Sequence, residues 1–215
     1  MNTFDFIVKK YNINLDGRYI IDIPNMGRDN MAELFTELNF NMGAEIGVFK
    51  GKYSEVLCKA NPNLKLYGVD AWMLDAHEPG VFVGDEEQAY FDKCYKETLG
   101  RMSPYKNYTI VKKLSMEAVK DFEDNSLDFV YIDAGHDFIS VANDLHHWQK
   151  KVRPGGIVSG HDYARYPSRK LIHVKRVLEA YVWSYRLQPL FVVGSMEIKK
   201  GEIRDRYRSW FLVKK

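Results

Sequence analysis

The sequence predicts an α/β fold in which a doubly wound, mostly parallel sheet of seven strands carries an antiparallel C-terminal hairpin strand. Short apolar runs rich in Val, Ile and Tyr alternate with stretches whose apolar residues recur at helical spacing. Turns that contain glycine, proline or asparagine separate these segments. The chain has 215 residues, which is enough to bury one sizeable core. This alternation favours βαβ units with helices on both faces of the sheet.

The individual elements can be assigned in chain order. Five apolar runs are the predicted parallel strands, at residues 43–48, 64–70, 108–114, 127–133 and 156–162. The segments with helical spacing predict helices over residues 52–60, 86–102, 116–122, 137–152 and 171–181. Two later apolar runs, 190–193 and 210–213, suit an antiparallel hairpin at one sheet edge. Residues 1–40 are predicted to be a helical extension around one extended piece, 19–23, and residues 41–215 to form the main domain.

Composition and charge exclude several classes of function. The formal net charge of +2 is too small to indicate nucleic-acid binding. Every apolar run is shorter than the roughly 20 residues that span a bilayer, so we expect no membrane segment and a cytoplasmic protein. The 2 cysteines fit no zinc or redox spacing. The remaining partner is a small molecule, and the N-terminal 40 residues are a candidate contact for a homo-oligomer.

A glycine-containing turn follows the first predicted strand. The strand ends in Glu45-Ile-Gly47, and the turn Val48-Phe-Lys-Gly51 leads directly into a helix. Glycines let a backbone approach a ligand closely, and a helix N-terminus offers unpaired N–H groups. The pattern differs from the dinucleotide fingerprint because Glu45 replaces its first glycine. A carboxylate there would repel a pyrophosphate and suits a cationic amino-acid cofactor instead.

Asp70 ends the second predicted strand, in Leu66-Tyr-Gly-Val-Asp70. An acidic residue at this strand tip can accept hydrogen bonds from both hydroxyls of a ribose. The alternative role for Asp70 is to cap the next segment. Together with Glu45 and Gly47, the position favours a nucleoside ligand.

Four ionisable residues follow the fourth and fifth predicted strands. Asp133 and His136 stand in Asp133-Ala-Gly-His136, and the next strand ends in His161-Asp162-Tyr163. Adjacent parallel strands would direct all four into one crevice, and such a cluster is typical of a functional site. Carboxylates with an imidazole can hold Mg²⁺, or a histidine alone can remove a proton. Both roles remain open at this point.

Taken together, these motifs resemble the class I S-adenosylmethionine-dependent methyltransferases, which share a Rossmann-like fold. Within them, the segments around Glu45, Asp70, Asp133 and 154–163 resemble the branch of macrocin-type and related sugar O-methyltransferases. The resemblance spans about residues 40–165. It implies a small-molecule substrate, with a hydroxyl of a sugar or sugar-like acceptor as the methylated group.

The resemblance also implies roles for individual residues. Glu45, Gly47 and Gly51 would contact the methionine end of S-adenosylmethionine, Asp70 would hold its ribose, and Ser115 and Met116 would flank its adenine. His136 would be the base, aided by Asp133. In metal-dependent members the ligands correspond to Asp133, His161 and Asp162, and the sequence departs from that pattern at His161. Mg²⁺ and a metal-free, histidine-based version therefore both remain as expectations.

Two rival functions stay open on the sequence. A nucleotide-dependent oxidoreductase would use the same doubly wound sheet, although Glu45 argues against it. A non-catalytic cofactor-binding module would have the same fold without turnover. Residues 72–85 are predicted to be a long loop that could cover the acceptor. Tyr163, Arg165 and Tyr166 are either further acceptor contacts or ordinary surface residues.

Overall fold

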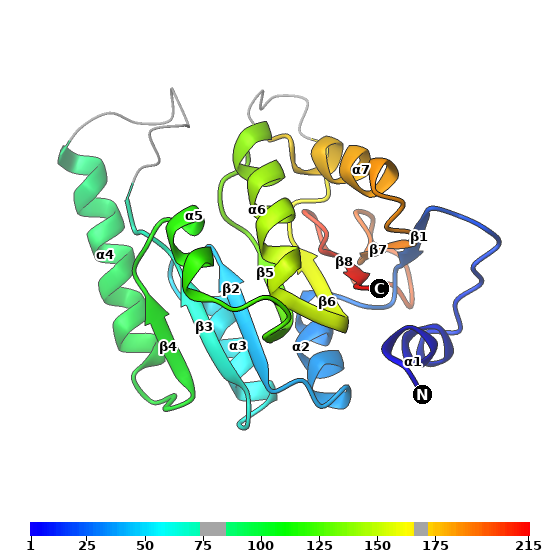
Figure 1. Cartoon of the computed structure of the whole chain (residues 1–215), viewed down its shortest axis with the longest axis horizontal. Helices are drawn as coiled ribbons and strands as arrows, with labels where there is room; N and C mark the ends of the chain where they lie inside the picture. The colour runs from blue at the N-terminus through cyan, green and yellow to red at the C-terminus, as the bar shows by residue number, and fades with distance from the viewer. Residues whose placement is uncertain (74–84, 166–171) are drawn as a thin grey trace.

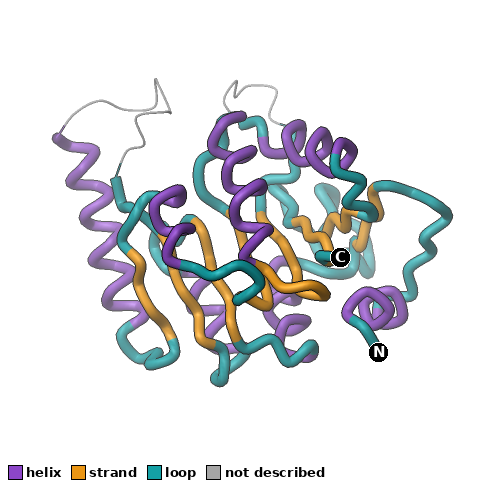
Figure 2. The backbone as a smooth tube through the Cα atoms, viewed as in Figure 1, coloured by secondary structure: helices purple, strands orange, loops and turns teal. Residues whose placement is uncertain are grey.

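The computed structural model of the chain describes residues 1–73, 85–165 and 172–215. Its centre is an 8-stranded sheet with the strand order β1-β7-β8-β6-β5-β2-β3-β4. Helices cover both faces of this sheet, as the predicted doubly wound architecture requires (Figure 1). Figure 2 shows the strands as one layer between the helices. Among the described residues, no helix has the length and apolarity needed to cross a bilayer.

The order of the elements agrees with the predicted segments, while some bounds differ by three or four residues, most of all those of β4, β6 and α7. The strands are β1 (Ile20–Ile23), β2 (Met42–Ile46), β3 (Lys65–Val69), β4 (Tyr108–Val111), β5 (Leu127–Ile132), β6 (Val152–Gly160), β7 (Leu190–Val193) and β8 (Trp210–Val213). The helices are α1 (Thr3–Lys10), α2 (Arg28–Glu37), α3 (Lys52–Ala60), α4 (Asp85–Met102), α5 (Ser115–Ala118), α6 (Phe138–Lys151) and α7 (Val174–Ser184), with a short 3₁₀ turn η1 (Val119–Asp121) after α5.

The sheet has one more strand than the seven predicted. The extended piece in the N-terminal segment is strand β1, which pairs in parallel with β7. Ile21 and Ile23 bury their side chains there, and this burial stabilises a pairing between segments far apart in the chain. The predicted antiparallel strand is β8, which lies between β6 and β7 and runs antiparallel to both. Strand β1 therefore occupies the edge at which the sequence predicted the hairpin.

Strand β5 lies near the middle of the sheet and is buried on both faces. Val130 packs into the apolar cluster that contains Trp148 of α6. Phe129 and Tyr131 point to the opposite face, where they join the cluster that contains Phe35 of α2. A strand buried on both sides needs a continuous apolar run, and residues 127–132 supply one with a single charged residue. The N-terminal helix α2 thus packs on the sheet itself.

The connections place the site between β2 and β5. From β2 the chain proceeds outward through β3 and β4, and it then crosses to the other side to form β5 and β6. Strands β2 and β5 are parallel neighbours, with Ile46 beside Ile132. The strand order therefore reverses between them, and in open α/β sheets ligands bind in the crevice beyond the carboxyl ends of such strands.

Candidate functional site

A cavity of about 1080 Å³ opens at the carboxyl ends of β2, β3 and β5. Most of the predicted site residues line it: Glu45, Gly47, Asp70, Ser115, Met116, Asp133, His136 and Asp162. Gly51 and His161 do not line the cavity. A cavity of this size can hold a nucleoside cofactor together with a small acceptor.

The glycine turn after β2 has a backbone that only glycine adopts readily at two positions. Gly47 has a φ of +90°, and a Cβ added to it would lie 2.0 Å from the backbone carbonyl oxygen of Asp133. The Gly47 N–H donates to the Val69 carbonyl oxygen at 2.9 Å, which joins the turn to β3. Gly51, with a φ of +69°, is the residue from which α3 begins. Gly51 therefore shapes the turn without lining the cavity, and a Cβ there would meet Thr98 of α4 at 3.2 Å.

Asp70 fixes this turn through its carboxylate. One carboxylate oxygen accepts hydrogen bonds from the backbone N–H groups of Val48, at 2.9 Å, and Phe49, at 2.8 Å. The other oxygen accepts from the Trp72 N–H at 2.7 Å, so Asp70 also caps the segment that follows it. Each carboxylate oxygen can accept more than one hydrogen bond, and Asp70 still faces the cavity.

Glu45 lies in β2, directly before the turn, and is 1% exposed. Its carboxyl group is hydrogen-bonded to the Ser54 hydroxyl. Burial raises the pKa of Glu45 to about 8, against the opposing effects of the Ser54 hydrogen bond and the positive charge of Arg28. At neutral pH this carboxyl group is therefore largely protonated, and the remaining negative charge of the cavity is carried by the aspartates.

Arg28, the first residue of α2, reaches the same cavity and was not anticipated from the sequence. Its guanidinium carbon lies 4.1 Å from the ring centre of Tyr53 and 5.0 Å from that of Tyr131. Its Nη2 donates to Asp133 Oδ2 at 3.0 Å. No local pattern identifies Arg28, because Asp133 lies 105 residues further along the chain.

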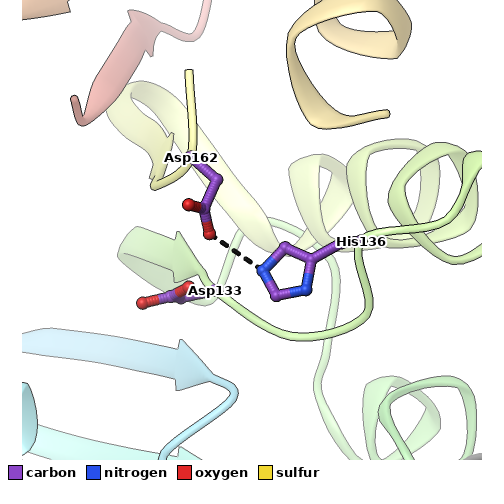
Figure 3. A group of neighbouring side chains, drawn as sticks. All are labelled: Asp133, His136 and Asp162. Atoms are coloured by element: carbon purple, nitrogen blue, oxygen red, sulfur yellow. Dashed lines mark hydrogen bonds and ion pairs between the residues drawn. The ribbon is translucent and has the colours of Figure 1, made fainter. Parts of the chain in front are cut away.

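Asp133, His136 and Asp162 gather at the ends of β5 and β6 (Figure 3). His136 Nε2 lies 2.8 Å from Asp162 Oδ2, and the three side chains present potential ligand atoms within 4.8 Å of one another. Asp162 has a φ of +61°, a left-handed conformation that is uncommon outside glycine and turns its side chain toward His136. The loops after two adjacent strands thus bring together residues that the sequence predicted would meet.

His161 takes a different position from the one expected of a metal ligand. Its Nδ1 lies 3.9 Å from Asp133 Oδ2 and 3.6 Å from Asp162 Oδ2, while Nε2 lies 4.0 Å from Asp205 Oδ1. The compact cluster contains His136 where the sequence had suggested His161. The ring of His161 packs beside Tyr207, with ring centres 6.2 Å apart.

The opposite wall of the cavity begins with α5. The Ser115 hydroxyl is bonded to the Asp144 carboxylate and accepts a hydrogen bond from Trp148 Nε1 at 2.8 Å. These bonds fix the start of α5 against α6, with Met116 lining the cavity beside it. Among the expected acceptor contacts, Tyr163 is buried and donates to Glu179. Tyr166 and residues 74–84 of the predicted loop lie outside the described residues.

Comparison with known proteins shows which family and which solved structures this chain is similar to. The family model described as a methyltransferase domain matches residues 44–163. An uncharacterized protein of Sinorhizobium fredii is 25% identical over 122 residues, which are 56% of this chain and 12% of that protein. The chain thus spans only 12% of the length of that curated relative.

Solved structures share the fold at low sequence identity. The O-methyltransferase TomG from Streptomyces achromogenes, in complex with S-adenosylmethionine, matches with a TM-score of 0.59 and 15% identity, over 87% of this chain and 80% of TomG. An O-methyltransferase from Bacillus cereus, in complex with S-adenosylhomocysteine, matches with a TM-score of 0.59 and 11% identity, over 99% of this chain and 87% of that one.

Proposed function

Because the chain belongs to the family of methyltransferase domains, we propose that it transfers a methyl group from S-adenosylmethionine to a hydroxyl of a sugar or sugar-like small molecule. The observation that supports this most is the pair of His136 and Asp162 beside Asp133, in the cavity that the glycine turn also lines. The family assignment removes the nucleotide-dependent oxidoreductase as an alternative. A binding module without turnover is distinguished by measuring methyl transfer.

The lining residues fit a cofactor of this chemistry. S-adenosylmethionine carries a sulfonium and an ammonium group, and the aspartates of the cavity suit these positive charges. Glu45 and the turn from Gly47 to Gly51 would hold the methionine end, and Asp70 would accept bonds from the ribose hydroxyls. Ser115 and Met116 would lie beside the adenine. When bound, the cofactor supplies a methyl group that is already electrophilic.

The protein then has to orient the acceptor hydroxyl and remove its proton. His136 Nε2 lies at hydrogen-bonding distance from the Asp162 carboxylate, which favours the tautomer with the proton on Nε2. We assign the His136 imidazole as the base that receives the proton from the acceptor. Asp162 stabilises the imidazolium that forms, and Asp133 orients the acceptor, held in place by Arg28.

Asp133, His136 and Asp162 could hold a divalent ion, but two of their carboxylate oxygens are engaged with other side chains in this arrangement. Asp133 Oδ2 is already bonded to the half-buried guanidinium of Arg28, and Asp162 Oδ2 is bonded to His136. A guanidinium does not lose its proton at any ordinary pH, so it would repel a second cation at Asp133. The proposed chemistry therefore uses the histidine-based version, with no step that depends on Mg²⁺.

Calorimetric titration of the purified protein with S-adenosylhomocysteine tests the cofactor part of this proposal. We expect binding in the micromolar range. Asp70→Ala should weaken it at least about tenfold, since the variant loses both the turn-holding bonds and the ribose contact. Asp124→Ala, which removes an exposed carboxylate outside the cavity, is the matched control. Absence of binding to the unmodified protein would overturn the proposed function.

A further inference from the structure

Arg28 is a cation built into the wall of the cavity. Its guanidinium packs on two buried aromatic rings, those of Tyr53 and Tyr131, and the Tyr53 hydroxyl donates to the Arg28 carbonyl oxygen at 3.1 Å. The side chain is 28% exposed, and the described residues that surround it leave its buried Nε without a hydrogen-bond partner. A guanidinium has five N–H donors, and the bond to Asp133 uses one of them. Arg28 can therefore bind a second anion.

The other lysines and arginines among the described lining residues are engaged or exposed at the surface. Lys50 pairs with Glu97 at 3.3 Å, Lys113 pairs with Asp121, and Lys52 is exposed. Lys50 also lies over two rings, those of Phe49 and Tyr90, at 5.5 and 5.7 Å, whereas Arg28 packs closer, at 4.1 and 5.0 Å, on two rings that are buried. Such packing holds a guanidinium in one orientation, so a bond from it costs little further ordering.

The proposed cofactor brings one negative group into an acidic cavity. Its amino-acid end carries an ammonium group and an α-carboxylate, and the carboxylate would be repelled by Asp133, Asp162 and Asp70. Within this cavity, the partner for a carboxylate is a fixed cation near Glu45 and the glycine turn, where the methionine end would lie. Arg28 is electrostatically coupled to both Glu45 and Asp133. Guanidinium and carboxylate also match in shape and form strong charged hydrogen bonds.

We propose that Arg28 binds the α-carboxylate of S-adenosylmethionine, so that the N-terminal segment completes the cofactor site. This inference rests on the proposed function, because it assumes that cofactor. It assigns to α2 a direct role in ligand binding, beyond its packing on the sheet. An anionic group on the acceptor has the same chemistry as the α-carboxylate, and the experiment below separates the two sources.

The test compares two ligands that differ only in the carboxylate. One is S-adenosylhomocysteine, and the other is its decarboxylated analogue, which keeps the thioether, the amine and the adenosine. Calorimetry should show that the unmodified protein binds S-adenosylhomocysteine about ten- to a hundredfold more tightly than the analogue. Arg28→Ala should lose that factor for S-adenosylhomocysteine and bind the analogue within about twofold of the unmodified protein. Arg28→Lys should recover part of the difference.

The matched control is Arg153→Ala. Arg153 also packs on an aromatic ring, Phe40, and pairs with an aspartate, Asp128, but it lies outside the cavity. The Arg153→Ala variant should keep the preference for S-adenosylhomocysteine over the decarboxylated analogue. Thermal unfolding shows whether Arg28→Ala is folded under the conditions of the titration. Arg28→Gln keeps more of the side-chain volume and is measured in the same way.

Three results would overturn the inference. If Arg28→Ala lowers the affinity for both ligands by the same factor, Arg28 only supports the fold of the cavity. Unchanged affinity for S-adenosylhomocysteine would assign the guanidinium to the acceptor instead. Absence of binding of both ligands to the unmodified protein would overturn the proposed function, and this inference with it.

Discussion

The two halves of the cavity are built in different ways. The half expected to hold the cofactor comes from β2, β3 and the turn between residues 46 and 52, and Asp70 fixes it by bonds to backbone N–H groups. The half that carries Asp133, His136 and Asp162 depends on side-chain pairs between α2, β5 and β6. The first half is determined by local backbone geometry and the second by distant segments of the chain. Substitutions in the first half should therefore reduce stability and cofactor binding, whereas substitutions in the second half should mainly reduce turnover.

The largest effect should come from His136→Ala. Loss of a general base lowers turnover by about 10²- to 10⁴-fold. The affinity for S-adenosylhomocysteine should change by less than about threefold, because His136 lies in the half that we propose contacts the acceptor. Methyl transfer from labelled S-adenosylmethionine to an acceptor found by screening measures the first quantity, and calorimetry measures the second. His147→Ala, on α6 but outside the cavity lining, is the control. Equal losses in turnover and in cofactor affinity would contradict the assignment of His136 as the base.

Gly47→Ala should distort the turn after β2, in the half of the cavity that is expected to hold the cofactor. The added Cβ would meet the Asp133 carbonyl oxygen at 2.0 Å, in a conformation with positive φ. We expect a loss of about 3 kcal/mol or more in the free energy of unfolding, measured with urea, together with loss of cofactor binding. Gly100→Ala is the control, since Gly100 lies in α4 and a Cβ there meets nothing within 4 Å. That change should stabilise the protein by about 0.5–1 kcal/mol. A stable, cofactor-binding Gly47→Ala variant would show that the turn can rearrange.

The same difference explains what the sequence could and could not predict. Glu45, Gly47 and Asp70 stand at the ends of two apolar runs, so their place follows from the alternation of strands and helices. Asp133 and Asp162 follow from the same rule. Arg28 does not, because its contact with Asp133 depends on how α2 packs on the far side of β5. The sequence predicts strand β1 only as an extended piece, because no local pattern marks its pairing with β7.

Stability should depend on pH through the buried carboxyl group of Glu45. Burial raises its pKa from the usual 4.5 to about 8, so the folded protein retains this proton over a range in which the unfolded chain has lost it. The contribution of Glu45 to the free energy of unfolding is therefore unchanged below about pH 4.5, falls as the pH rises toward 8, and levels off above it. One pKa unit corresponds to about 1.4 kcal/mol, so the decline between pH 5 and pH 8 should be about 3–4 kcal/mol.

Urea unfolding of the unmodified protein and of Glu45→Gln across this pH range measures that contribution. Gln cannot ionise, so the variant should lose the decline that Glu45 causes while keeping the pH dependence of the other groups. Ser54→Ala removes the hydroxyl partner and leaves Glu45 titratable, so its decline should persist. If the free energy of unfolding depends on pH in the same way for the unmodified protein and Glu45→Gln, Glu45 is ionised in the folded protein. The cavity then carries a further full negative charge at Glu45.

The smallest effect should be that of divalent ions, and it tests whether the second half of the cavity relies on Arg28 as its cation. Asp133 is bonded to Arg28 and Asp162 to His136, so we expect Mg²⁺ or a chelator to change the affinity for S-adenosylhomocysteine by less than about twofold. Calorimetry with Mg²⁺ and with a chelator measures this. In Arg28→Gln the competing positive charge is absent, so titration with Mn²⁺ alone should detect binding that the unmodified protein lacks. Stoichiometric Mn²⁺ binding to the unmodified protein, abolished by Asp133→Asn, would instead support the metal-assisted version, in which Asp133, Asp162 and His161 or His136 hold the ion and Arg28 has to move away from Asp133.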